Sequence, residues 1–286
     1  MQPNSPADTI INDNKIANGT PVLISDKFSF TEGPAVDKQG NVFFTDQPNN
    51  QIWKYSIDGK LSLFMDNTGR SNGMYFDKKG NLISCADEHN KLVAISPSKA
   101  ITVLADNFNG EIFNGPNDVW INPVNDDIYF TDPYYKRDYW EKDHPHIAEQ
   151  NVYYLQKNKK KAVLAAAEMT KPNGIIGTPD GKFLYVADIG ANKTYKFTID
   201  KNGSLINKQL FASQGSDGMT IDNKGNIYLT GKGITVYNKE GEIVQQIPIR
   251  EDWTANVCFG GKNHDELFIT ASKSVYILHT NVKGVQ

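Results

Sequence analysis

Six polar residues that can offer a side-chain oxygen open short apolar runs along this chain, at intervals of 40, 45, 56, 44 and 39 residues. We call these residues the anchors: Glu32, Asn72, Asn117, Asn173, Asp217 and Asn256. If each one begins the innermost strand of a repeated unit, the six side chains point toward one axis. None is a Lys or Arg, so a ring of oxygens with two carboxylates and no local cation could hold a metal ion.

Glu32 is the anchor that most favours a metal site over a set of ordinary turns. An Asn or Asp before a glycine is a common turn residue, so each of the other anchors taken alone indicates little. A glutamate is a poor turn residue, and Glu32 is followed by Gly-Pro at the start of an apolar run. A carboxylate buried there without a partner would cost several kcal/mol or lose its charge. We therefore predict a bound cation as its partner.

The donor types predict which cation that is. Oxygen ligands of the Glu, Asp and Asn type suit a hard divalent ion such as Ca²⁺, Mg²⁺ or Mn²⁺. Ca²⁺ is favoured because amide oxygens and a roomy site completed by water fit its longer bonds. Zn²⁺ is disfavoured because no His or Cys is among the anchors.

The segments between the anchors predict the fold. After each anchor the chain reads as strand, turn, strand, polar loop, strand, turn, strand, with an Asp-x-x-Gly-Asn turn in several copies. A period near 40 to 45 residues with four strands is typical of a propeller blade. An open array would expose sheet edges, so we predict closure. The expected fold is an all-β, six-bladed β-propeller with four-stranded blades, as one domain over residues 1–286.

The two ends of the chain predict how the ring closes. The sixth copy supplies three strands, whereas the segment Pro21–Asp26 reads as an outermost strand without a blade of its own. We predict that this segment completes the sixth blade, preceded by an N-terminal extension over residues 1–19.

The third copy contains an insertion. Alternating strands place the loops between second and third strands on the same face as the anchors. In the third copy this loop, residues 134–150, is long and rich in Tyr and Trp. Long loops in compact domains are commonly functional, so we predict a lid over the channel mouth. His144 and His146 resemble half of a metal site, but no carboxylate or Cys partner supports that interpretation.

Composition excludes several function classes. The formal net charge of −3 gives no electrostatic footprint for nucleic acid, and no apolar run has membrane-spanning length.

Residues 1–14 lack the regions of a signal peptide, which predicts a cytoplasmic protein, or a periplasmic or secreted one if a leader has been removed. Cys85 and Cys258 fall in different copies and are expected to be buried free thiols. The oligomeric state is left open.

Four segments resemble the metal-site motifs of the gluconolactonase, regucalcin and senescence-marker-protein family. They are Phe30-Thr-Glu-Gly-Pro-Ala35, Gly115-Pro-Asn-Asp-Val119, Lys171-Pro-Asn-Gly-Ile175 and Ser216-Asp-Gly-Met219. The resemblance runs from Pro21 to the last strand. It implies a propeller with one divalent metal ligated by Glu32, Asn173 and Asp217, with Asn117 as a further ligand or a close neighbour. The implied activity is hydrolysis of sugar lactones to aldonic acids.

For this reaction we expect the following roles for individual residues. Asp217 is the candidate that orients or deprotonates water, and Asn117 would donate to a substrate oxygen or complete the coordination. Hydrogen bonds to substrate hydroxyls and stacking against the sugar are expected from Asn72, His89, Tyr134, Tyr135, Arg137 and Trp140.

The chain departs from the family pattern at one informative place. Many relatives have an Arg shortly before the Pro-Asn-Asp motif, where this chain has Glu111-Ile-Phe-Asn114. A charged substrate would therefore lack one partner here. Asp132 matches the family, but similar Asp residues in other copies favour a hydrogen bond that staples the blade.

Two alternatives remain open at this point. The same metal site could hydrolyse phosphotriesters or other esters. Alternatively, the propeller could bind a ligand or protein partner without catalysis, because this fold serves many functions.

Overall fold

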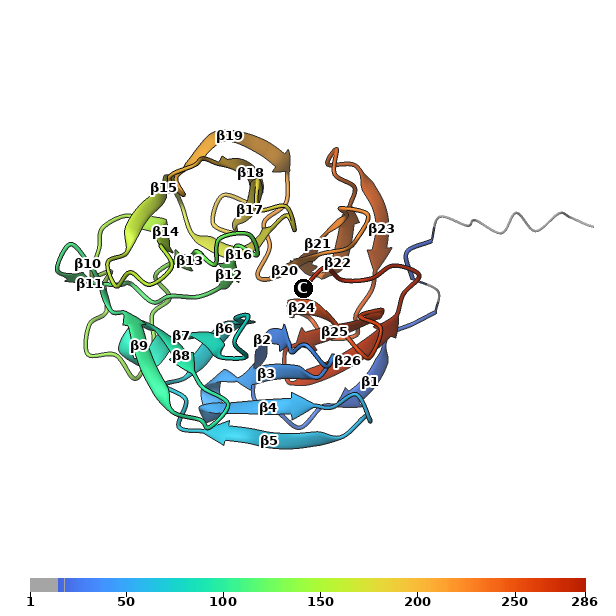
Figure 1. Ribbon diagram of the computed structural model, residues 1–286. Helices are drawn as coiled ribbons and strands as arrows, with labels where there is room; N and C mark the ends of the chain where they lie inside the picture. Colours follow the sequence, from blue (N-terminus) through green and yellow to red (C-terminus); the bar gives the residue numbers. More distant parts are fainter. Residues whose placement is uncertain (1–14, 18) are drawn as a thin grey trace, which may run out of the picture.

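Six antiparallel sheets surround a central axis in the computed structural model, which describes residues 15–17 and 19–286 (Figure 1). Each sheet has four strands, which confirms the predicted six-bladed propeller. Residues 1–14 of the predicted N-terminal extension lie outside the described residues. No helix in the part of the chain that the structure describes has the length and apolar character needed to cross a membrane.

The first three blades follow one another in the sequence. Blade one contains β2 (Thr31–Val36), β3 (Val42–Asp46), β4 (Gln51–Tyr55) and β5 (Leu61–Asp66). Blade two contains β6 (Ser71–Phe76), β7 (Leu82–Ala86), β8 (Lys91–Ile95) and β9 (Ile101–Ala105). Blade three contains β12 (Val119–Ile121), β13 (Ile128–Asp132), β14 (Gln150–Leu155) and β15 (Val163–Met169). Blades two and three are linked by a small hairpin of β10 (Asn107–Phe108) and β11 (Glu111–Ile112).

The last three blades repeat this order. Blade four contains β16 (Pro172–Gly177), β17 (Phe183–Asp188), β18 (Lys193–Ile199) and β19 (Leu205–Ala212). Blade five contains β20 (Met219–Ile221), β21 (Ile227–Gly231), β22 (Gly233–Tyr237) and β23 (Ile243–Ile247). Blade six contains β24 (Thr254–Gly260), β25 (Glu266–Ala271), β26 (Ser274–His279) and β1 (Val22–Ser25). Two short 3₁₀ turns, η1 (Gln47–Asn49) and η2 (Asp87–His89), follow β3 and β7.

Strand β1 closes the ring as predicted. It pairs antiparallel with β26, with Val22 opposite Ile277. Part of the predicted extension also packs against the ring, because Ile16 and Ala17 are buried and their main-chain N–H groups donate to Oε1 of Gln245. The first and last strands of the fold therefore share one sheet.

The tight turns between first and second strands form one face of the molecule. In the first, Oδ1 of Asp37 accepts from the main-chain N–H groups of Gln39 and Asn41, and Oδ2 accepts from the Asn41 side chain. Gly40 has a φ of +92°, which the turn requires. The same pattern recurs in blades two and five. The sequence Asp-x-x-Gly-Asn thus specifies a self-contained turn.

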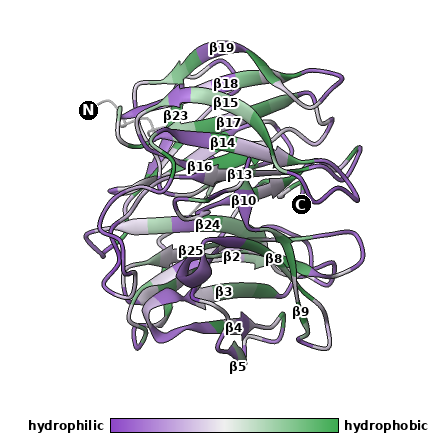
Figure 2. Cartoon of the chain, turned by 90° about the vertical axis from the view of Figure 1, so that its left-hand side faces the viewer, coloured by the Kyte–Doolittle hydropathy of each residue, from purple (hydrophilic) through white to green (hydrophobic). Residues whose placement is uncertain are grey.

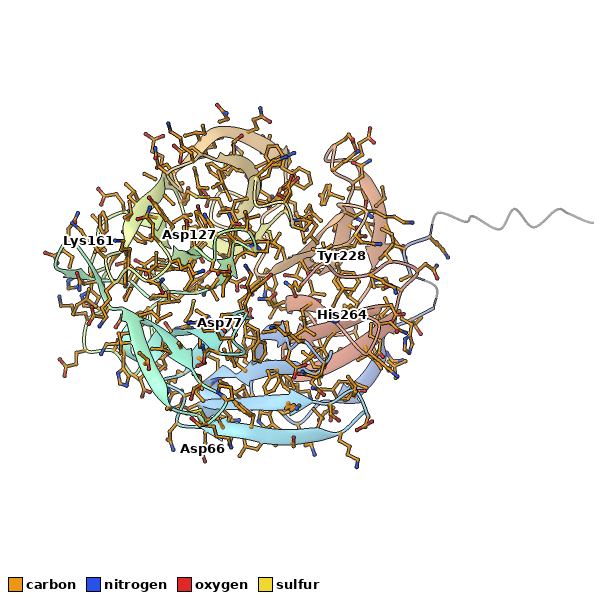
Figure 3. All side chains as sticks on the ribbon, viewed as in Figure 1. Asp66, Asp77, Asp127, Lys161, Tyr228 and His264 are labelled. Carbon is orange, nitrogen blue, oxygen red and sulfur yellow. The ribbon has the colours of Figure 1, made fainter. Side chains whose placement is uncertain are left out.

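Hydrophobic side chains fill the spaces between neighbouring blades. One cluster joins Trp120 and Tyr129 of blade three to Tyr185 of blade four. Hydrophilic segments gather in the loops at the two faces (Figure 2). Side chains such as Asp66 and Lys161 lie at the periphery, whereas Asp77 lies near the axis (Figure 3). Both cysteines are buried and free, as expected.

The pairing of β1 with β26 predicts a stability effect. Deleting the chain through Asp26 should lower the thermal unfolding midpoint by at least about 5 °C, because it leaves β26 as an unpaired edge. Circular dichroism melts would measure this. A synthetic peptide of residues 20–28 added in trans should recover part of the loss. An unchanged midpoint would contradict the closing role of β1.

Candidate active site

A cavity of about 260 Å³ lies on the axis, on the face that carries the loops between second and third strands. We call it the central cavity. Five of the six anchors line it: Glu32, Asn72, Asn117, Asn173 and Asp217. The rest of its wall comprises Phe30, Gln47, Tyr135, Arg137, Ile189 and Trp253. The sixth anchor, Asn256, supports this wall, since its Nδ2 donates to Oε2 of Glu32 at 3.1 Å. The fold therefore brings the anchors together around one space.

Hydrogen bonds from neighbouring blades to main-chain carbonyl oxygens hold several anchors in position. Oγ1 of Thr131, in the second strand of blade three, donates to the carbonyl oxygen of Asn173 in blade four at 2.9 Å. The carbonyl oxygen of Asn117 accepts from the N–H of Gly73 in blade two at 2.8 Å. Oγ1 of Thr45 lies 3.5 Å from the carbonyl oxygen of Asn72. Three of the six anchors thus have their backbone held by an adjacent blade.

The residue after most anchors is a glycine, and the structure explains why. A Cβ at Gly33 would overlap the carbonyl oxygen of Asn72, and one at Gly218 would overlap the side chain of Asn256. The inner strands approach too closely at these points for any larger residue. A motif that looks like an ordinary turn in the sequence is in fact a contact between blades.

The two anchor carboxylates lie in a poorly solvated environment. Glu32 is buried, and its pKa is raised well above the usual range, first by burial and then by the negative charges of Asp217 and Asp118. Desolvation by burial raises the pKa of Asp217 to about 6, although hydrogen bonds oppose that increase. Those bonds come from Nε1 of Trp253 at 2.6 Å and Nδ2 of Asn173 at 2.8 Å. These carboxylates repel one another and favour a cation between them.

Asp118 is a third carboxylate that the sequence analysis did not select. It is buried, and burial raises its pKa to about 8, with a further increase from Asp217. Its Oδ1 accepts from the N–H of Val119 at 3.1 Å, and its Oδ2 lies 3.4 Å from Nδ2 of Asn256. Its position directly after an anchor could have identified it in the sequence. Trp253, three residues before an anchor, was also not predicted, although its position near an anchor offered a similar signal.

The side chain of Asn173 provides a test of whether a metal ion fits. Its Nδ2 donates to the hydroxyl of Tyr135 and to Oδ1 of Asp217, both at 2.8 Å. Its Oδ1 is buried and has no hydrogen-bond partner among the described residues. An orphaned buried carbonyl oxygen beside the carboxylate of Asp217, in a cavity that Glu32 also lines, is a suitable ligand for a hard cation.

Carboxylates alone would not complete such a site. Within residues 15–17 and 19–286, no three His, Cys, Asp or Glu side chains gather closely enough to hold a metal ion by themselves. Amide oxygens would have to complete the coordination, as the anchor pattern predicts. The donor set therefore fits Ca²⁺ or another hard divalent ion better than Zn²⁺.

The insertion of blade three contributes two side chains to the central cavity. Tyr135 and Arg137 line it together with the anchor Asn72, so these three expected substrate contacts lie at the cavity. Burial raises the pKa of Tyr135, which keeps its hydroxyl protonated near neutral pH. Since its oxygen accepts from Asn173, its O–H can donate to another group.

The other three expected substrate contacts do not line the central cavity. The side chain of His89 is 64% exposed and lies beside Glu88. Tyr134 packs near Trp140, with ring centres 6.1 Å apart. Nε1 of Trp140 donates to the carbonyl oxygen of Asp87 at 3.1 Å. The two aromatic side chains therefore hold the insertion in place instead of facing the cavity.

Asp132 has the stapling role expected for it. Its two carboxylate oxygens accept from the main-chain N–H groups of Asn114 and Gly115, at 2.9 and 2.8 Å. These bonds fix the segment that leads into the Asn117 anchor.

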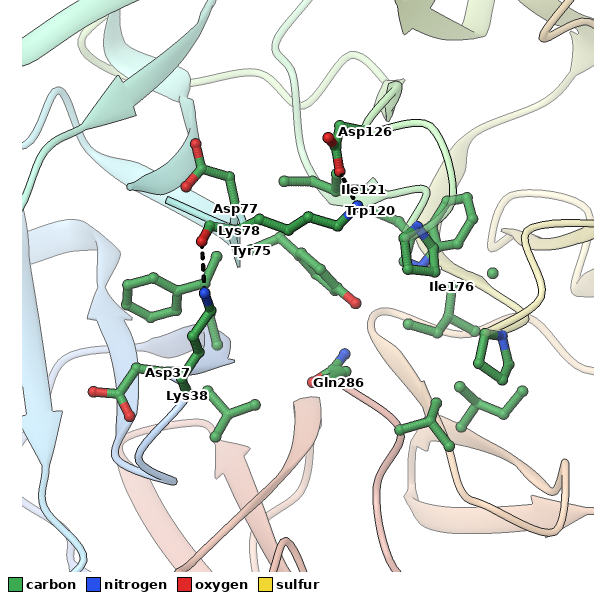
Figure 4. A pocket seen from close by; sticks show the side chains of 18 of the residues that line it. Asp37, Lys38, Tyr75, Asp77, Lys78, Trp120, Ile121, Asp126, Ile176 and Gln286 are labelled. Atoms are coloured by element: carbon green, nitrogen blue, oxygen red, sulfur yellow. Dashed lines mark hydrogen bonds and ion pairs between the residues drawn. The ribbon is translucent and has the colours of Figure 1, made fainter. Parts of the chain in front are cut away.

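A second cavity of about 330 Å³ opens on the turn face, at the opposite end of the axis (Figure 4). Its walls are mainly apolar and include Tyr75, Trp120 and Ile176. The charged groups at its rim are engaged with their surroundings, since Nζ of Lys38 donates to the carbonyl oxygen of Lys78, whose own Nζ lies 2.7 Å from Asp126. The mutually repelling carboxylates lie at the other end, which makes the central cavity the candidate active site.

Comparisons with known proteins agree with this geometry. A family model described as "SMP-30/Gluconolactonase/LRE-like region" matches residues 30–273. The gluconolactonase of Zymomonas mobilis subsp. mobilis is 29% identical over an alignment of 299 positions that covers 93% of this chain and 83% of that protein.

Two solved structures share the fold. The gluconolactonase XC5397 of Xanthomonas campestris superimposes with a TM-score of 0.84 at 23% identity, over 93% of this chain and 91% of that one. A calcium-binding regucalcin of Agrobacterium tumefaciens superimposes with a TM-score of 0.77 at 17% identity, over 93% and 95% of the two chains.

Proposed function

The chain belongs to the SMP-30/gluconolactonase/LRE-like family, and we propose that it is a lactonase that opens sugar lactones in the central cavity with the help of a divalent cation. The family relationship and the named gluconolactonase relatives support the lactonase activity. One observation supports the metal: the carboxylates of Glu32 and Asp217 line the same cavity as the buried, unpartnered Oδ1 of Asn173. Such a group of oxygens is unfavourable unless a cation binds among them.

Glu32, Asn173 and Asp217 would hold the cation, with Asn117 as a further ligand or a close neighbour. We favour Ca²⁺ because the set mixes carboxylate and amide oxygens. When bound, a divalent cation supplies Lewis-acid chemistry, which polarises the lactone carbonyl and stabilises negative charge on its oxygen.

Asp217 is our candidate for the group that activates water. Its carboxylate is held in one orientation by Nε1 of Trp253 and Nδ2 of Asn173. It would take a proton from a water molecule whose oxygen forms a bond to the carbonyl carbon of the lactone. The bond between that carbon and the ring oxygen then breaks, and the ring oxygen receives a proton. The product is the open aldonic acid.

The remaining wall residues would bind and orient the sugar. The Tyr135 hydroxyl can donate to a substrate oxygen, because its own oxygen already accepts from Asn173. Asn72, Asn117 and Arg137 add amide and guanidinium groups to the same space. Such fixed donors hold the carbonyl carbon close to the water and reduce the entropic part of the barrier.

Removal of a ligand should abolish activity but not folding. Asp217→Ala and Asn173→Ala should each lower kcat/KM for an aldonolactone at least about 100-fold, because each removes an oxygen from the cation site. A pH-indicator assay would measure the rates, and circular dichroism would check the fold. Chelator-treated wild type should lose activity and regain it with added Ca²⁺. Full activity in strong chelator would contradict the proposed role of the metal.

Glu32→Gln should cost no stability without metal, but it should remove most of the stabilisation that metal binding gives. In chelator, the variant should melt at the same temperature as wild type or higher, because one of the mutually repelling buried charges is gone. With Ca²⁺ at about 100 times its Kd, wild type should gain about 2.7 kcal/mol, whereas the variant should gain much less. An equal gain in both proteins would argue against Glu32 as a ligand.

A further inference from the structure

Three aspartates occupy equivalent positions at the ends of second strands and share one structural role. They are Asp46, Asp132 and Asp188, and each accepts two main-chain N–H groups from the segment before the inner strand of its own blade. These bonds staple the inner strand to its neighbour within the blade.

Asp87 lies one residue beyond the corresponding position of blade two, which is Ala86, and it makes different contacts. Its Oδ2 accepts from three side chains: Nε2 of Gln47 at 2.9 Å, Nε of Arg137 at 2.7 Å and the hydroxyl of Tyr139 at 2.6 Å. Its side chain is only 4% exposed. Because Ala86 has no carboxylate, Oδ1 of Asn50 accepts from the segment before β6 in blade two. The carboxylate of Asp87 makes none of the stapling bonds among the described residues and is available for another role.

The contacts of Asp87 dock the insertion of blade three, residues 134–150, which we call the lid. Gln47 belongs to blade one and Asp87 to blade two, so the lid is held by two blades besides its own. The Tyr139 ring also lies under the Arg70 guanidinium, at 4.4 Å. Trp140 packs on Gly115, where a Cβ would overlap its ring.

The same carboxylate fixes Arg137 in the central cavity. The Arg137 guanidinium lines the cavity beside the metal-site anchors. Its Nε pairs with Asp87, and among the described residues this is its one salt bridge. A guanidinium at such a wall needs a counter-charge. With Nε held by Asp87, the two terminal nitrogens of Arg137 are left to donate to a substrate.

We infer that Asp87 is a positioning residue for lactone binding: it docks the lid and aims Arg137 into the central cavity. This inference rests on the proposed lactonase function for its kinetic part, whereas the docking of the lid can be tested independently of activity.

The kinetic test compares Asp87→Asn with Asp188→Asn, a matched change at one of the stapling aspartates. On an aldonolactone, Asp87→Asn should raise KM about tenfold or more, with a smaller change in kcat, because a charge-assisted hydrogen bond to Arg137 is lost. Asp188→Asn should lower the melting temperature but leave KM within about twofold. Asp87→Asn with an unchanged KM would overturn the inference.

A double-mutant cycle separates positioning from general damage. Arg137→Ala should raise KM to a similar extent, and the double variant Asp87→Asn/Arg137→Ala should be little worse than either single variant. Effects that multiply would mean that Asp87 does not act through Arg137, which would overturn the inference.

Limited trypsin digestion tests docking without using activity. Cleavage within the lid, after Lys136 or Lys142, should be at least about fivefold faster in Asp87→Asn than in wild type or Asp188→Asn, because lid opening becomes easier. Equal cleavage rates would overturn the docking part. A wild type that hydrolyses no lactone would refute the proposed function, and this digestion would still decide whether Asp87 docks the lid.

Discussion

The inner strands of the six blades approach one another closely at the axis, and both the packing and the candidate active site follow from this. At Gly33 and Gly218, which each follow an anchor, the neighbouring inner strand leaves no room for a Cβ. The same approach places the anchor side chains around one small space. Backbone packing and the candidate active site are therefore two consequences of one geometry, and a larger residue at Gly33 or Gly218 would disturb both.

This arrangement concentrates negative charge in a poorly solvated place. Glu32, Asp118 and Asp217 come from three different blades, and each has a raised pKa. Their repulsion opposes folding, and the apolar packing between blades must overcome it. A closed ring can offset this repulsion, because it has many apolar contacts between its blades. The cost is characteristic of functional sites, where local rules for stability are broken.

The repeats made much of the fold and of the site predictable. The spacing of the anchors predicted the blades and the meeting of the anchors at the axis, and a strand without a blade of its own predicted the closure, since these features follow from a pattern that recurs. Residues that depart from the pattern were harder. Asp87 lies one residue beyond the repeated position of the stapling aspartates, and Asp118 contacts Asn256 of a distant blade. His89 points away because its short 3₁₀ turn directs it to solvent. Such placements depend on tertiary contacts that no local pattern encodes.

Closure by β1 has a consequence for the order in which the protein folds during synthesis. During synthesis β1 emerges before any blade, yet its partner β26 belongs to the last one, so the order of assembly differs from the order of translation. Asn256, which supports Glu32, lies in that same sheet. Until this final blade leaves the ribosome, Glu32 lacks the hydrogen bond from Asn256, so the candidate active site is complete only when the last blade has formed.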